Sequence, residues 1–252
     1  MQRNINSLIG FRLDATDGEI GKVEEFYFDD DTWTIRYLIL KTGNWLSGRK
    51  LLISPQSLIS DPREKGMFST TLTKEQVRNS PDIDTDKPVS RQQEIELHGY
   101  YPWQSYWGSG YYPGGIWGNV DFPPIVRKEA TEEAGLVTRR RAGDDVHLRS
   151  TYRLTGYRME GADGTIGHVR DFILDDQTWQ ILYLVVDTHQ RYGGKKVLIE
   201  VGHVREVQWD HSTFVTDETI DSVNSSPSME VWAFKHAGPS HALRDDHSIH
   251  LK

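Results

Sequence analysis

Residues 8–12 read LIGFR and residues 154–158 read LTGYR, which places residue 8 opposite residue 154 at an offset of 146 positions. The same offset holds without a gap as far as Pro81 and Pro227, and roughly a third of the aligned positions are identical. Identical pairs include turn-forming and core-forming residues, among them Gly10 and Gly156, Asp29 and Asp175, Trp33 and Trp179, Tyr37 and Tyr183, Phe68 and Phe214. A match of this length predicts two copies of one domain in a single chain.

Each copy reads as a set of short strands separated by turns. In the first copy Trp33, Ile35, Tyr37 and Ile39 alternate with the residues between them, as in a strand with one buried face, and the second copy repeats the pattern. Trp33 and Trp179 are expected to anchor the two cores, although a large ring could also serve as a ligand platform. Several short strands with frequent turn signals favour a small sandwich or barrel.

Local signals refine this reading of each copy. The apolar residues of the segment 21–29 do not alternate cleanly, and a bulge near Glu24-Glu25 would restore the register. Thr73 is expected to cap one helical turn that ends before Pro81. The sequence therefore predicts strands with one short helical turn at the end of each copy.

These residues resemble the PRC-barrel family, which includes the cytoplasmic domain of the photosynthetic reaction-centre H subunit and the C-terminal domain of a ribosome maturation factor. The resemblance covers residues 8–81 and 154–227 and is carried by GEIGKVEEF (18–26) with YLIL (37–40), and by GTIGHVRDF (164–172) with YLVV (183–186). It implies a short, mostly antiparallel barrel and roles in protein docking and complex assembly. It implies no catalytic residues, since the family places different functions on one barrel.

The expected fold class is mainly β, with two small PRC-type antiparallel β-barrels in tandem, short helical turns and an irregular linker. The expected organisation is given by composition and by the repeat. It comprises a first repeat at 1–85, a polar and then aromatic, Gly- and Pro-rich linker at 86–150, a second repeat at 151–230 and a polar tail at 231–252.

The linker is the most unusual stretch, because aromatic residues crowd a segment rich in Gly and Pro. They could pack on the barrels, since aromatic rings bury large areas, or form a docking surface for a protein or carbohydrate partner. Disorder is a third reading. The residues predicted to bind a partner are Tyr100, Tyr101, Trp103, Tyr106, Trp107, Tyr111, Tyr112 and Trp117.

Composition excludes several classes of protein. The chain has no cysteine, which excludes disulfides, thiolate catalysis and iron–sulfur clusters. Its net charge of −8 disfavours general nucleic-acid binding. No apolar run approaches the roughly 18 residues that a transmembrane helix needs. We therefore expect a soluble, cytoplasmic protein, with peripheral association with a membrane complex left open.

Catalytic and metal-binding patterns are weak in this sequence, and no cofactor is expected. It contains no nucleophile elbow, phosphate-binding loop or zinc-protease motif. The pairs Asp29-Asp30 and Asp175-Asp176 suit turn formation, and a cation or proton role is the alternative. The tail carries histidines that could bind a transition metal but lack a helical frame. They are His236, His241, His247 and His250.

Together these features predict a non-enzymatic protein-interaction or assembly module whose protein partner is unknown. One alternative is an accessory subunit of a photosynthetic or electron-transfer membrane complex. A second is a metal-dependent enzyme that uses the turn acids and the tail histidines. The two copies could form an internal pseudo-dimer, or each could pair in a homo-oligomer.

Overall fold

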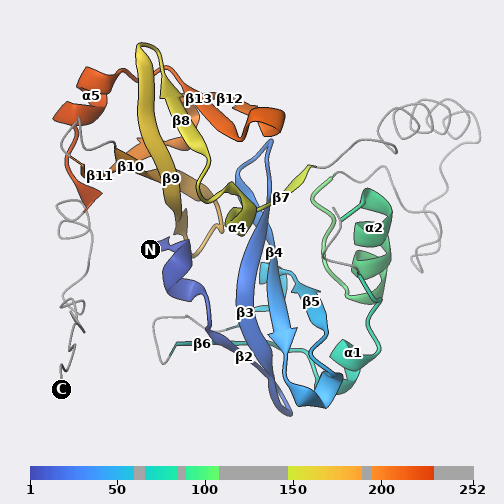
Figure 1. Cartoon of the computed structure of the whole chain (residues 1–252). Helices are drawn as coiled ribbons and strands as arrows, with labels where there is room; N and C mark the ends of the chain where they lie inside the picture. The colour runs from blue at the N-terminus through green and yellow to red at the C-terminus, as the bar shows by residue number, and fades with distance from the viewer. Residues whose placement is uncertain (60–65, 84–88, 108–146, 189–193, 230–252) are drawn as a thin grey trace, which may run out of the picture. The chain divides into compact units, whose positions relative to one another are not determined.

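The computed structural model describes residues 1–59, 66–83, 89–107, 147–188 and 194–229 (Figure 1). The chain forms two compact units. Ser7–Tyr152 makes up the first-repeat unit, and Met1–Asn6 together with the residues from Arg153 onward makes up the second-repeat unit. Strands dominate both units, which confirms the predicted mainly-β class.

One sheet builds the first-repeat unit. Its strands are β2 (Arg12–Ala15), β3 (Gly18–Asp29), β4 (Thr34–Thr42), β5 (Lys50–Ile53), β6 (Met67–Ser69) and β7 (Leu148–Ser150). They follow the order β5-β4-β3-β2-β6, and β7 pairs with β3. Neighbours are antiparallel except β2 and β6, which run parallel. A parallel neighbour needs a crossover connection rather than a hairpin, and the chain reaches β6 only after passing through β5.

The second-repeat unit repeats this plan. Its strands are β1 (Gln2–Asn4), β8 (Arg158–Gly161), β9 (Gly164–Asp175), β10 (Ile181–Thr188), β11 (Lys196–Glu200), β12 (Val204–Gln208) and β13 (Thr213–Thr216). The order is β11-β10-β9-β8-β13-β12, and β1 pairs with β9. Here β8 and β13 form the parallel pair. Short helical turns complete the described fold: η1 (Ile5–Leu8), η2 (Asn44–Leu46), η3 (Pro55–Ser57), α4 (Thr151–Leu154), η5 (Val201–His203) and η6 (Trp209–His211).

Matching side chains fill the two cores. Burial of large apolar groups is the main favourable contribution to folding, so equivalent buried residues indicate equivalent folds. The equivalent buried pairs include Ile20 and Ile166, Phe26 and Phe172, Leu38 and Leu184, Phe68 and Phe214, Val77 and Val223. The sequence repeat is therefore a structural repeat.

The predicted turns and bulges are present in both copies. Glu24 is skipped in the pairing of β3 with β4, and Arg170 is skipped at the equivalent place in β9, which confirms the predicted bulge. Asp29 Oδ1 accepts hydrogen bonds from the N–H groups two and three residues further on, at 3.1 and 3.0 Å. Asp175 Oδ1 accepts the same two bonds at 2.8 and 3.0 Å, so the predicted turn role of these aspartates is confirmed.

The expectation that Trp33 and Trp179 begin strands and anchor the cores is wrong. Both close the preceding turn in the left-handed region, at φ 56° and 59°, and both are only half-buried. Their N–H groups donate to the carbonyls of Asp29 and Asp175, each at 2.8 Å. A hydrogen bond that closes the turn fixes the backbone here. The strands therefore begin after the tryptophans, at Thr34 and at Ile181.

Two helices extend the first-repeat unit. The helix α1 (Lys74–Arg78) begins after Thr73, whose hydroxyl accepts from the N–H of Gln76 at 3.2 Å, as predicted. Its counterpart in the second-repeat unit is α5 (Ile220–Ser225). The longer α2 (Arg91–Tyr100) lies within the range assigned to the linker and was not predicted. No helix among the described residues is long and apolar enough to cross a membrane.

Candidate functional site

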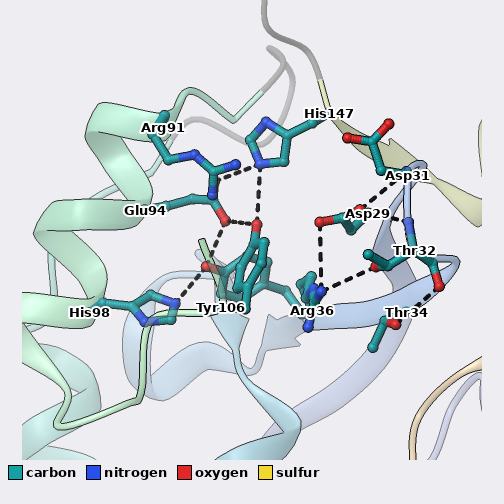
Figure 2. Close-up of polar contacts among 11 residues, drawn as sticks. Asp29, Asp31, Thr32, Thr34, Arg36, Arg91, Glu94, His98, Tyr106 and His147 are labelled. Atoms are coloured by element: carbon teal, nitrogen blue, oxygen red, sulfur yellow. Dashed lines mark hydrogen bonds and ion pairs between the residues drawn. The ribbon is translucent and has the colours of Figure 1, made fainter. Parts of the chain in front are cut away.

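The carboxylate of Glu94 is the centre of a buried polar cluster in the first-repeat unit (Figure 2). Glu94 lies in the first turn of α2 and is 0% exposed. The helix starts there because Ser90 and Gln93 form a capping box, with hydrogen bonds of 3.3 and 3.0 Å. A carboxylate also interacts favourably with the positive end of a helix dipole. Local helix chemistry therefore fixes where α2 begins and places Glu94 in its first turn.

Four side chains from separate segments surround this carboxylate. Oε1 accepts hydrogen bonds from the hydroxyls of Tyr37 at 2.9 Å and Tyr106 at 2.5 Å. Oε2 lies 2.7 Å from His147 Nε2 and 3.0 Å from a guanidinium nitrogen of Arg91. A buried carboxylate is tolerated only with such partners, because an unpaired buried charge is strongly destabilising. Glu94 thereby connects β4, α2, the residue that precedes β7 and the described residues 101–107, which we call the aromatic segment.

His98 extends the network by one turn of α2. Its Nε2 lies 2.8 Å from the hydroxyl of Tyr37. Since Tyr37 has one proton and donates it to Glu94, His98 must donate from Nε2. Burial lowers the pKa of His98, while the charge of Glu94 and the carbonyl of Trp103 act in the opposite direction. Burial, followed by the nearby Glu94 charge, raises the pKa of Tyr37 and of Tyr106. The network therefore holds neutral phenols and a neutral imidazole around one carboxylate.

Two arginines cover Tyr106. The guanidinium carbon of Arg36 lies 3.8 Å from the centre of the Tyr106 ring, and that of Arg91 lies 5.2 Å from it. Arg91 also lies 4.6 Å from the centre of the Trp107 ring. Figure 2 shows Arg36 reaching from the strand toward the turn, where it bonds Thr32 at 3.1 Å and lies 3.6 Å from Asp29. These cation–π contacts order side chains that are otherwise flexible.

The aromatic segment that follows α2 enters the core of the first-repeat unit. Tyr101 and Trp103 are buried and stacked, with ring centres 4.3 Å apart. Trp103 Nε1 donates to the hydroxyl of Ser57 at 2.7 Å. The backbone N–H of Gln104 donates to the side-chain oxygen of Gln56 at 2.9 Å, and the side-chain amide of Gln56 donates to the backbone carbonyl of Gln104 at 3.0 Å. Residues 101–104 therefore pack on the first-repeat unit, as expected if the aromatic rings of the linker bury their area against a barrel.

The residues predicted to bind a partner therefore fall into three groups. Tyr101 and Trp103 are core residues of the first-repeat unit. Tyr100 is 39% exposed, and Tyr106 and Trp107 are half-buried around the Glu94 cluster. The others lie outside the described residues: Tyr111, Tyr112 and Trp117.

Most of the cluster was missed by the sequence analysis. Arg36, Arg91, Glu94, His98 and His147 belong to no recognised motif, and α2 has no counterpart among the described residues of the second repeat. The one local signal was the capping pattern at residues 90–93, which marks a helix start but not a buried charge. Nowhere in the described part of the chain do three or more His, Cys, Asp or Glu side chains gather to hold a metal ion. The tail histidines lie outside that part.

Two sheets with the same strand order at β2–β5 and β8–β11, in one chain, define a duplicated small β-domain. The family model of the PRC-barrel domain matches residues 2–72 and 159–222, which together exceed half of the chain. The chain therefore belongs to the PRC-barrel domain family, which confirms the resemblance found in the sequence. No curated protein matches the sequence.

Proposed function

We propose that this chain is a non-enzymatic assembly protein that docks a protein partner on the first-repeat unit. The docking site is the arginine–aromatic surface, which comprises Arg36, Arg91, Tyr106 and Trp107. Membership of the PRC-barrel family favours an interaction or assembly role in general. The contacts around Glu94 favour this particular face.

The observation that carries the proposal is the support beneath this surface. Tyr106 is held at its hydroxyl by the bond to buried Glu94 and at its ring by the guanidiniums of Arg36 and Arg91. Tyr, Trp and Arg are the residues that most often dominate the free energy of protein–protein association. Side chains held in one conformation before binding lose less entropy when a partner arrives. A rigid and partly exposed set of these residues suits a docking site.

The state of Glu94 supports a role without catalysis. Both carboxylate oxygens accept bonds from protein groups, and the residue is fully buried. A general acid or base needs a substrate within hydrogen-bond reach. A carboxylate that is saturated by internal donors is better suited to hold Tyr106 and Arg91 in position.

The test compares two full-length variants in binding to the same partner. A tagged chain is used to isolate a partner from native extract, and the purified pair is then titrated. Trp107→Ala removes a ring at the arginine–aromatic surface and should weaken binding at least about 10-fold. Tyr152→Ala removes a ring that is 76% exposed elsewhere in the same unit, and should leave affinity unchanged. Recovery of no partner by the native chain, or equal affinity of the two variants, would reject the proposal.

A further inference from the structure

Each sheet contains one short strand that does not come from its own repeat. β1 lies in the second-repeat sheet but precedes the first repeat in the chain, and β7 lies in the first-repeat sheet but precedes the second repeat. We call β1 and β7 the leading strands. β7 pairs with β3, with Ser150, Arg149 and Leu148 opposite Tyr27, Phe28 and Asp29. β1 pairs with β9, with Asn4, Arg3 and Gln2 opposite Ile173, Leu174 and Asp175. Every residue of the second set is related to one of the first by the 146-residue offset, so both strands bind in the same register.

The equivalence continues beyond the strand ends. The N–H of Asp30 donates to the carbonyl of His147 at 3.0 Å, and the N–H of Asp176 donates to the carbonyl of Met1 at 2.9 Å. These donors again occupy equivalent positions, in the turns that follow β3 and β9. The leading strands are thus held by the same backbone bonds in both sheets, although their sequences differ.

Arginine is the one residue that residues 1–7 and 147–153 share at equivalent positions, as Arg3 and Arg149. Arg149 Nε donates to Asp30 Oδ2 at 2.7 Å, and Arg3 Nε donates to Asp176 Oδ2 at 2.6 Å. Both pairs are mostly shielded from solvent, with side-chain exposures of 22% and 17% in the first sheet and 14% and 6% in the second. Shielded ion pairs are less screened than surface pairs and contribute more to specificity.

A second acidic residue contacts each leading segment. Glu25 in β3 accepts a hydrogen bond from the hydroxyl of Ser150. At the equivalent position in β9, Asp171 Oδ1 accepts from the N–H of Asn6 at 3.2 Å. Burial raises the pKa of Asp171 to about 6, and the N–H groups of Phe172 and Asn6 counteract that rise. Two acids, five positions apart, therefore flank the bound segment in each sheet.

We propose that the C-terminal ends of β3 and β9 are strand-binding sites for an extended segment that carries an arginine. The two sites are residues 27–29 and residues 173–175. Each site is filled by the leading strand of the other repeat, so the chain closes both sheets by reciprocal strand exchange. The backbone ladder supplies the affinity, and the arginine opposite the turn aspartate supplies the selection. Because both contacts are made by residues outside 108–146, the N-terminal and C-terminal parts of the chain should stay associated after that segment is cut. The site at β3 adjoins the arginine–aromatic surface, because His147 accepts from the N–H of Asp30 through its carbonyl and lies 3.1 Å from the hydroxyl of Tyr106 through its ring.

The experiment cuts the full-length chain after it has folded. A protease recognition sequence flanked by glycine and serine is inserted between residues 125 and 126, and complete cleavage is checked under denaturing conditions. Size-exclusion chromatography with light scattering then gives the mass of the native product. We expect both fragments in one species with the mass of the intact chain. Separation of the native-sequence fragments would overturn the proposal.

The role of the arginines is measured on the same cut protein. Combining Arg3→Glu with Arg149→Glu should raise the dissociation constant of the two fragments at least about 10-fold. The control is Arg158→Glu, which breaks an ion pair to Glu160 that is 3.5 Å long and 51% exposed at the arginine. Unchanged association of the double variant would overturn the selection by arginine.

A rescue variant separates lost recognition from lost folding. Exchanging the charges of both pairs, with Asp30→Arg and Asp176→Arg added to Arg3→Asp and Arg149→Asp, should bring the fragments together again. Circular dichroism of the uncut variants shows whether the sheets form. If the double variant is unfolded before cutting, Arg3→Gln and Arg149→Gln are tested singly, and each should weaken association. Fragments that bind equally well after either single change would count against the proposal.

Discussion

At the scale of single residues, the unusual feature is a carboxylate that is fully buried. Glu94 accepts from two phenols and one imidazole and pairs with Arg91. Removing one partner of such a set leaves the others buried and unsatisfied. The cluster therefore makes α2 and the aromatic segment depend on one side chain.

Glu94→Gln tests this dependence. The amide keeps an oxygen for the tyrosines but offers N–H groups to His147 and Arg91, which are donors themselves. We expect a loss of about 3–5 kcal/mol in the free energy of unfolding, as for breaking a buried ion pair. Glu96→Gln is the matched control, because this residue on the same helix is exposed and accepts a 3.3 Å hydrogen bond from Gln92. It should change stability by no more than about 0.5 kcal/mol in urea unfolding.

At the scale of elements, the sequence predicted features whose cause is local. The Asp turns, the bulge at Glu24 and the cap at Thr73 depend on residues within a few positions of each other. Because the two copies align at the 146-residue offset, the same bulge and the same Asp turn were expected in the second copy. Trp33 was misplaced because the alternation of residues 33–40 does not show that a hydrogen bond closes the turn at the first of them.

The helix α2 and its cluster could not be predicted in this way. Residues 91–100 are mostly polar, and a polar segment beside a Gly-rich one is normally exposed. Glu94 is buried only because Tyr37, Tyr106 and His147 arrive from distant positions in the sequence. Contacts of that kind are set by tertiary packing, which a single sequence does not display.

A glycine in each long strand gives a prediction about the elements themselves. A Cβ on Gly21 would lie 2.4 Å from the carbonyl oxygen of Lys41, and one on Gly167 would lie 2.0 Å from that of Asp187. Backbone must move to relieve either contact, so each Gly→Ala change should destabilise its sheet by about 1–3 kcal/mol or more. Gly202→Ala is the control, since a Cβ there meets nothing within 4 Å. Thermal unfolding that ranks Gly202→Ala with the other two would contradict this account.

At the scale of the whole molecule, described residues on the two sides of positions 108–146 meet through their side chains. Tyr106 and His147 lie 3.1 Å apart at their side-chain tips, and both bond Glu94. A connection between these two residues needs only a few extended residues, at up to about 3.5 Å each. The length of the segment is therefore not required to join the two repeats.

Replacing residues 109–145 by eight Gly and Ser residues should leave both units folded. The shorter loop loses less entropy on closure, so stability should rise by about 1 kcal/mol in urea unfolding.

The same variant tests which group of aromatic residues binds the partner. It keeps Tyr106 and Trp107 but lacks Tyr111, Tyr112 and Trp117, so a partner that docks on the arginine–aromatic surface should bind it with unchanged affinity. Loss of binding by a folded variant would move the docking site into the deleted segment, and loss of folding would show that the segment supports the sheets.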